Sequence, residues 1–92
     1  MVSTTITLST ALARFTNGEK QFNVPPGSFA DVMNHVHARH PLLRDKLTDS
    51  GARPLPFINI FINGENVRHG FDPDLVVEPG AEVLIMSAVA GG

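Results

Sequence analysis

The sequence contains no cysteine. The chain therefore has no disulfide bond, no thiolate nucleophile and no cysteine-based metal site. No stretch approaches the 18 consecutive apolar residues of a membrane-spanning helix. The N-terminal sequence MVSTTITLST also lacks the charged and long apolar regions of a signal peptide. These absences favour a cytoplasmic protein without a membrane partner.

Charged residues are scarce, at 17% of 92 residues, and the net charge is −2. With 42% hydrophobic residues, this is the composition of a globular chain, and we expect one domain over residues 1–92. No basic face is evident, which argues against nucleic acid as a partner. No Lys or Arg follows Arg68, whereas Asp72, Asp74, Glu78 and Glu82 all do. We expect the tail end of the molecule to be acidic, either as a surface for a basic partner or as an ordinary solvated face.

Motifs of independent catalysis are also missing. The sequence has no GxxxxGK[ST] phosphate-binding loop and no GxSxG nucleophile motif, so we do not expect an enzyme. Three histidines, His35, His37 and His40, lie close together. On a helix, however, His35 and His37 point about 200° apart, and two imidazoles are too few for a secure zinc site. We expect a polar helix face, with no metal and no other cofactor bound.

Alternating apolar and polar residues predict strands at residues 4–9, 19–24, 57–63 and 81–89, with a shorter strand at 65–68. The connection over residues 10–18 ends in an Asn-Gly turn, and Leu12 and Phe15 should fold over the end of the core. Two prolines and a glycine break the second strand. Residues 42–47 are expected to form a short helical turn, and residues 72–80 a helical turn followed by a second break.

One amphipathic helix is predicted over residues 29–40. Ser28 is a good N-cap, with Asp31 three residues later. The apolar stripe consists of Phe29, Val32, Met33 and Val36. A helix with a single apolar stripe buries that stripe against one face of a sheet. The element order therefore predicts an α+β fold, a β-grasp or ubiquitin-like roll, in which a mixed sheet of four to five strands packs on one main helix.

Strand alternation also predicts an exposed apolar patch. If Ile58, Ile60 and Ile62 face the helix, Phe57, Asn59 and Phe61 face outward. If Val83 and Ile85 face inward, Leu84 and Met86 face outward. The outward residues would form one surface for partner docking, unless residues 48–56 or a second copy of the chain cover it. The predicted patch is Phe57, Asn59, Phe61, Leu84 and Met86.

The ending MSAVAGG, the segment INGENVR and the strand order together resemble the ubiquitin-like sulfur-carrier family of ThiS, MoaD and CysO, most closely its CysO-like branch. The resemblance covers the whole chain. It implies a flexible tail over about residues 87–92, with Gly92 as the site of adenylation and thiocarboxylation and Gly91, Ala90 and Val89 leading to it. Glycine suits such a tail because it lacks a Cβ and passes through a narrow channel.

The resemblance further implies two partners: an adenylating enzyme that uses ATP and a sulfur donor, and a biosynthetic enzyme that accepts the sulfur for cysteine, molybdopterin, thiamin or a similar product. The free carrier is expected to be a monomer. Two alternatives remain open. In the first, the protein is a ubiquitin-like modifier that is joined to lysines of target proteins through Gly92. In the second, it is a β-grasp binding module whose tail has no chemical role.

Overall fold

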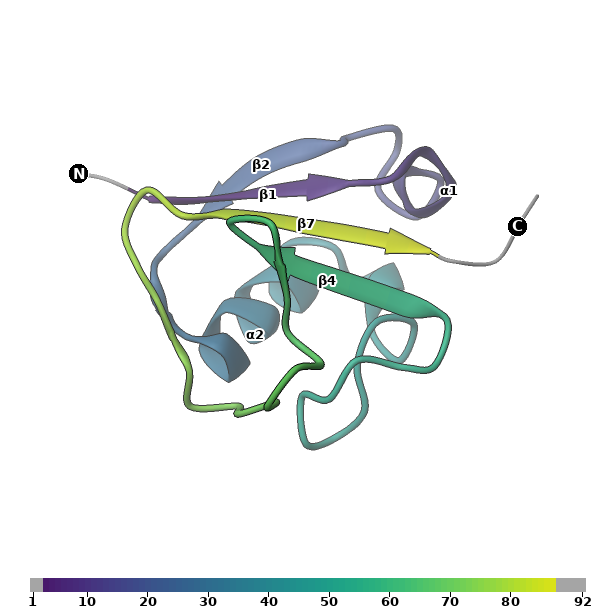
Figure 1. The fold of residues 1–92 in the computed structure, drawn as a ribbon. Helices are drawn as coiled ribbons and strands as arrows, with labels where there is room; N and C mark the ends of the chain where they lie inside the picture. Colours follow the sequence, from purple (N-terminus) through teal and green to yellow (C-terminus); the bar gives the residue numbers. More distant parts are fainter. Residues whose placement is uncertain (1–2, 88–92) are drawn as a thin grey trace.

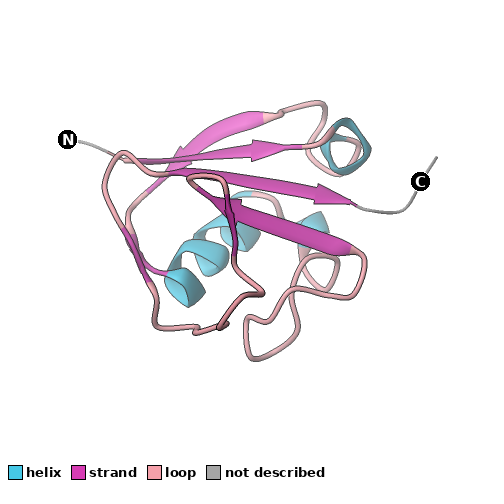
Figure 2. Ribbon diagram, viewed as in Figure 1, coloured by secondary structure: helices cyan, strands magenta, loops and turns pink. Residues whose placement is uncertain are grey.

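The structure is a computed structural model that describes residues 3–87. One twisted sheet lies across one main helix (Figures 1 and 2). The sheet has five strands in the order β2-β1-β7-β4-β5. Their bounds are β1 Thr4–Leu8, β2 Gln21–Val24, β4 Ile58–Ile62, β5 Glu65–Asn66 and β7 Glu82–Ser87. β1 and β7 pair in parallel and the other neighbours pair antiparallel. This arrangement confirms the predicted β-grasp roll.

Helix α2 (Phe29–Arg39) forms as the sequence indicates. The Ser28 side chain accepts a hydrogen bond from the Asp31 N–H at 3.1 Å, which satisfies one of the free donors of the first turn. The helix ends at Arg39, one residue before the predicted end, because Pro41 disfavours helical geometry at His40. A single 3-10 turn, η1 (Pro41–Leu43), follows.

The core lies between α2 and the inner face of the sheet. The predicted helix stripe is fully buried against inward-facing residues of the four longer strands, which are Ile6, Leu8, Phe22, Val24, Ile58, Ile60, Val83 and Ile85. Each such side chain contributes about 1.5–3 kcal/mol on burial. Leu12 is buried and Phe15 packs against the cluster, as predicted. Ile62, at the end of β4, is only half-buried.

One element was not predicted, and one local prediction was wrong. The connection between β1 and β2 contains a short helix, α1 (Thr10–Ala13). A helical turn was predicted over residues 72–80, but Val76–Val77 forms strand β6, which pairs antiparallel with β3 (Gly27–Ser28). Contacts with a distant part of the chain explain why residues 76–77 form a strand. The free N–H groups of Phe29 and Ala30 at the start of α2 donate to the carbonyls of Leu75 and Pro73, at 2.7 and 3.0 Å, and hold this segment extended.

Candidate functional site

The outer face of the sheet, turned away from α2, carries an apolar half on β4 and β7. Phe61 lies opposite Leu84, and Asn59 lies opposite Met86. Leu84 and Met86 remain 38% and 36% exposed, and Phe61 and Asn59 are half-buried. The structure therefore brings four of the five predicted patch residues together on one face.

Phe57, the fifth predicted residue, lies in a turn before β4 that the Ile58 N–H closes by donating to the Leu55 carbonyl at 2.9 Å. Phe57 is 64% exposed. The adjacent β4 residue, Ile58, pairs with Ser87, so Phe57 belongs to the end of the face where β7 finishes.

The apolar half contains a shallow depression of about 410 Å³. Its lining residues are Phe61, Asn63, Gly64, Glu82, Leu84 and Met86. Residues 48–56 do not line it, so that loop is not the cover considered from the sequence. The depression is open to a partner.

The other half of the outer face is polar. It comprises Thr5 and Thr7 on β1 with Gln21 and Asn23 on β2. The Thr5 hydroxyl donates to the side-chain Oδ1 of Asn23 at 3.1 Å, and the Gln21 side-chain amide donates to the Thr7 hydroxyl at 3.4 Å. Because these groups pair with one another along the sheet, the apolar half has a sharp boundary between β7 and β1.

The turn between β4 and β5 fixes the far rim of the depression. Asn63 and Gly64 both have positive φ, 49° and 85°, as a two-residue hairpin of this type requires. The Asn63 side-chain oxygen accepts from the Glu82 N–H at 3.0 Å, while the Asn63 N–H donates to the Glu82 carbonyl at 2.9 Å. These two bonds lock the hairpin to the first residue of β7.

The last residues of β7 are held beside the end of β1. The Ser9 N–H donates to the Ile85 carbonyl at 3.0 Å, and the Ser87 N–H donates to the Ser9 hydroxyl at 3.4 Å. The predicted attachment residue Gly92, with Gly91, Ala90 and Val89, lies outside the described residues. The structure establishes the position of Ser87, the last residue of β7, which precedes them in the sequence.

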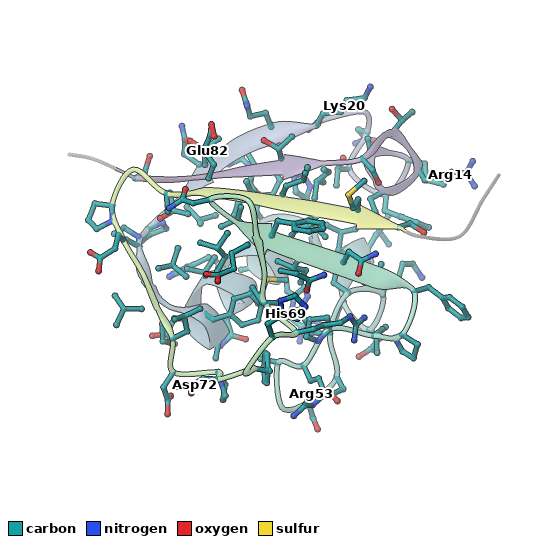
Figure 3. All side chains as sticks on the ribbon, in the orientation of Figure 1. Arg14, Lys20, Arg53, His69, Asp72 and Glu82 are labelled. Atoms are coloured by element: carbon teal, nitrogen blue, oxygen red, sulfur yellow. The ribbon has the colours of Figure 1, made fainter. Side chains whose placement is uncertain are left out.

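The prediction of an acidic tail end was wrong. Figure 3 shows Glu82 and Asp72 at the end of the molecule where β7 begins, and Arg14 at the opposite end, where β7 finishes. Lys46 is also near Arg14's end of the molecule, with its ammonium 4.9 Å from the centre of the Phe15 ring. Asp72, Asp74 and Glu78 precede β7 and Glu82 is its first residue, so the length of the strand separates these carboxylates from its C-terminal end.

Sequence reasoning did not find an ion-paired cluster on the helix side of the molecule. Glu19 accepts from Arg39 Nε and Nη2 at 2.8 and 2.9 Å and lies 2.7 Å from His40 Nε2. Hydrogen bonds from Arg39 and then His40 lower the pKa of Glu19 to about 2. The cluster ties the β1–β2 connection to the end of α2. The fold thus uses the Glu19 carboxylate internally.

Arg68 is likewise engaged within the fold. Its Nη2 donates to the carbonyls of Leu55 and Ile58, the latter at 2.6 Å. Both carbonyls belong to the turn that carries Phe57 into β4. Arg68 therefore positions one edge of the apolar half, a role that no sequence motif signals.

The three neighbouring histidines do not share one helix face: His35 is exposed on α2, whereas His40 follows the helix and contacts Glu19. His37 is half-buried beside Arg44 and Asp45, and burial lowers the pKa of its imidazole. Within residues 3–87, no three His, Asp or Glu side chains come close enough together to bind a metal ion. In the same part of the chain, no helix has the length and apolar character needed to cross a membrane.

Comparisons with known proteins identify the family. The model of the ThiS family matches residues 6–92. The sulfur carrier protein CysO of Mycobacterium tuberculosis is 28% identical over 93 residues, which cover 99% of this chain and all of that protein. The solved structure of an Amycolatopsis orientalis BexX/CysO complex matches with a TM-score of 0.85 and 29% identity, over 98% of this chain and 100% of the matched chain.

The crystal structure of SAMP1 from Haloferax volcanii shares the fold, with a TM-score of 0.78 and 22% identity over 98% of this chain and 99% of that one. The fold, the outward apolar half of the sheet and the family match through residue 92 agree with one another. The chain belongs to the ThiS family of ubiquitin-like sulfur-carrier proteins and is similar to its CysO members.

Proposed function

We propose that this protein carries sulfur as a thiocarboxylate on the carboxyl group of Gly92 and delivers it to a biosynthetic enzyme. The observation that carries the proposal is the family match, which runs through the terminal Gly91-Gly92 pair. The product would be cysteine, molybdopterin, thiamin or a similar sulfur compound. The similarity to CysO supports a CysO-like pathway.

The chemistry requires a separate activating enzyme. A terminal carboxylate, with a pKa of about 3.5, is ionised and unreactive at neutral pH. In the proposed step, the carboxylate oxygen attacks the α-phosphorus of ATP and pyrophosphate leaves. A sulfide-type nucleophile then attacks the acyl carbon and AMP leaves with the bonding electrons. The sequence contains no phosphate-binding loop motif of its own, so the protein is a co-substrate and its partner is the catalyst. ATP and the sulfur donor belong to that partner.

The apolar half of the outer face is the proposed docking surface. Phe61, Leu84 and Met86 form its centre, with Asn59 and Phe57 toward the end of β7. Exposed apolar patches on small domains mark interaction sites. β7 contributes Leu84 and Met86 to the patch and leads to the proposed attachment residue Gly92. The six residues after Met86 span at most about 20 Å when extended. The BexX/CysO complex shows that a relative assembles with another protein.

The test is intact-mass spectrometry after incubation with a cognate adenylating enzyme, ATP and sulfide. We expect the mass change of one oxygen replaced by sulfur, located at Gly92 and absent when Gly92 is deleted. Stable adenylation without sulfur uptake would instead favour the protein modifier that joins lysines. No reaction with any cognate activator would leave a binding module.

Docking is tested separately by placing one carboxylate on each half of the face. Leu84→Asp should slow adenylation by about tenfold or more, because an unpaired charge at a desolvated contact costs more than ~1.4 kcal/mol. The matched control is Asn23→Asp on the polar half, which preserves the oxygen that accepts from Thr5. Equal rates for the two variants would refute the assignment of the apolar half.

A further inference from the structure

A second concave surface lies at the opposite end of the sheet from Ser87. It is a groove of about 310 Å³ between β5 and the segment that leads into β6. Its lining residues include Ile62, Glu65, His69, Asp72, Leu75 and Val76. The volume is at the lower limit for a small-molecule site. It suits one or two side chains of a partner protein better than a whole ligand.

The apolar part of the groove is exposed but firmly held. Leu75 and Val76 are 43% and 63% exposed. Their backbone is fixed, because the Leu75 carbonyl accepts from the Phe29 N–H and Val76 pairs with Ser28. The Asp72 side chain accepts from the Asp74 N–H at 2.9 Å and shapes the preceding turn. Two apolar side chains are thus presented to solvent on a rigid frame.

Two carboxylates line the groove. Glu65 and Asp72 line it, and Asp74, Glu78 and Glu82 belong to the same stretch of chain. Within residues 3–87, none of these five carboxylates forms an ion pair. Figure 3 shows Asp72 projecting from the surface below His69.

The nearby cations are already engaged. The Arg68 guanidinium bonds to two backbone carbonyls, and the Arg53 guanidinium lies 4.8 Å from the centre of the Phe71 ring. Neither forms an ion pair with a groove carboxylate. Charge complementarity therefore indicates a cationic occupant.

We propose that this groove binds a segment of a partner protein in which lysine or arginine residues flank an apolar side chain. The apolar side chain would contact Leu75 and Val76, and the cations would face Glu65 and Asp72. β7 runs for about 17 Å between its two ends at ~3.3 Å per residue, and the Asn63–Glu82 bonds place the groove at its beginning. A protein bound in the groove leaves the end of β7 accessible, so this protein can be held by one partner while another engages its reactive end.

The test is a titration of the ¹⁵N-labelled full chain followed by two-dimensional NMR, without ATP, an activating enzyme or sulfur. Its result is therefore independent of the proposed sulfur chemistry. The probes are three synthetic peptides: alternating lysine and isoleucine, glutamate in place of lysine, and serine in place of isoleucine. We expect the lysine–isoleucine peptide alone to shift the amide resonances of residues 65–67 and 72–76 in a saturable manner.

Two variants separate the apolar and ionic contributions. Val76→Asn, and the pair Glu65→Gln with Asp72→Asn, should each weaken binding of the lysine–isoleucine peptide by about tenfold. The matched control is Leu42→Asn, which removes an equally exposed apolar side chain (67%) from η1. Equal binding of all three peptides, shifts confined to Leu84 and Met86, or an unchanged affinity in Val76→Asn would each overturn the proposal.

Discussion

Replacing Arg68 with Ala should strongly destabilise the protein. The guanidinium donates to the carbonyls of Leu55 and Ile58, and a hydrogen bond to a charged group contributes about 1.5–3 kcal/mol. The site is only partly buried, so water replaces part of that loss. We therefore expect a decrease of about 2–4 kcal/mol in the free energy of unfolding. A domain of 92 residues has a total of about 5–14 kcal/mol, so the loss is a large share.

Urea denaturation measures this effect. With an m-value of about 1 kcal/mol/M for a small domain, the midpoint should fall by about 2–4 M at an unchanged m-value. Arg68→Lys, which keeps one charged donor, should be intermediate. Arg14→Ala is the control, because the Arg14 side chain forms no hydrogen bond or ion pair within residues 3–87. A fall of less than about 0.5 M for Arg68→Ala, equal to that of the control, would refute a stabilising role for the two hydrogen bonds of Arg68.

Three further changes test the fold. Because the folded pKa of Glu19 is about 2, its stabilisation is fully present above about pH 4.5 and is lost as the pH falls toward 2. Glu19→Gln should therefore lower urea midpoints at pH 6 but converge with the wild type near pH 2. Because burial lowers the pKa of His37, the wild type should lose stability as the pH falls below about 6.5. His37→Leu should flatten that part of the plot of melting temperature against pH. Parallel plots for the variant and the wild type would contradict this prediction. Gly64→Ala should cost about 1–2 kcal/mol from backbone strain alone, since φ is +85° and no atom lies within 4 Å of the added Cβ. Gly64→Asn should cost less, and equal denaturation midpoints for the two variants would argue against strain.

The sequence predicted the features that depend on local patterns. Alternation placed Leu84 and Met86 outward and Val83 and Ile85 inward, and the structure confirms both faces. The Ser28 cap formed as predicted, because capping needs only a side-chain oxygen three residues before a free N–H.

Features that depend on distant groups were not predictable in the same way. Strand β6 exists because carbonyls at Pro73 and Leu75 meet the start of α2. The ion-paired cluster joins Glu19 to a residue 20 positions away, and nothing in the local sequence marks that pairing. The acidic residues were predicted at the wrong end of the molecule for a simpler reason. Their closeness to the chain end in sequence does not make them close to it in space.

The central position of β7 determines how the protein would bear mechanical load. β7 is bonded to β1 on one side and to β4 on the other. The inter-strand bonds run across the strand direction, so a pull applied beyond Ser87 would load both ladders in shear, with many bonds sharing the force. A pull on an edge strand such as β2 would instead peel one ladder open bond by bond. The strand that leads to the proposed attachment residue Gly92 is thus the one that the sheet anchors most firmly against tension.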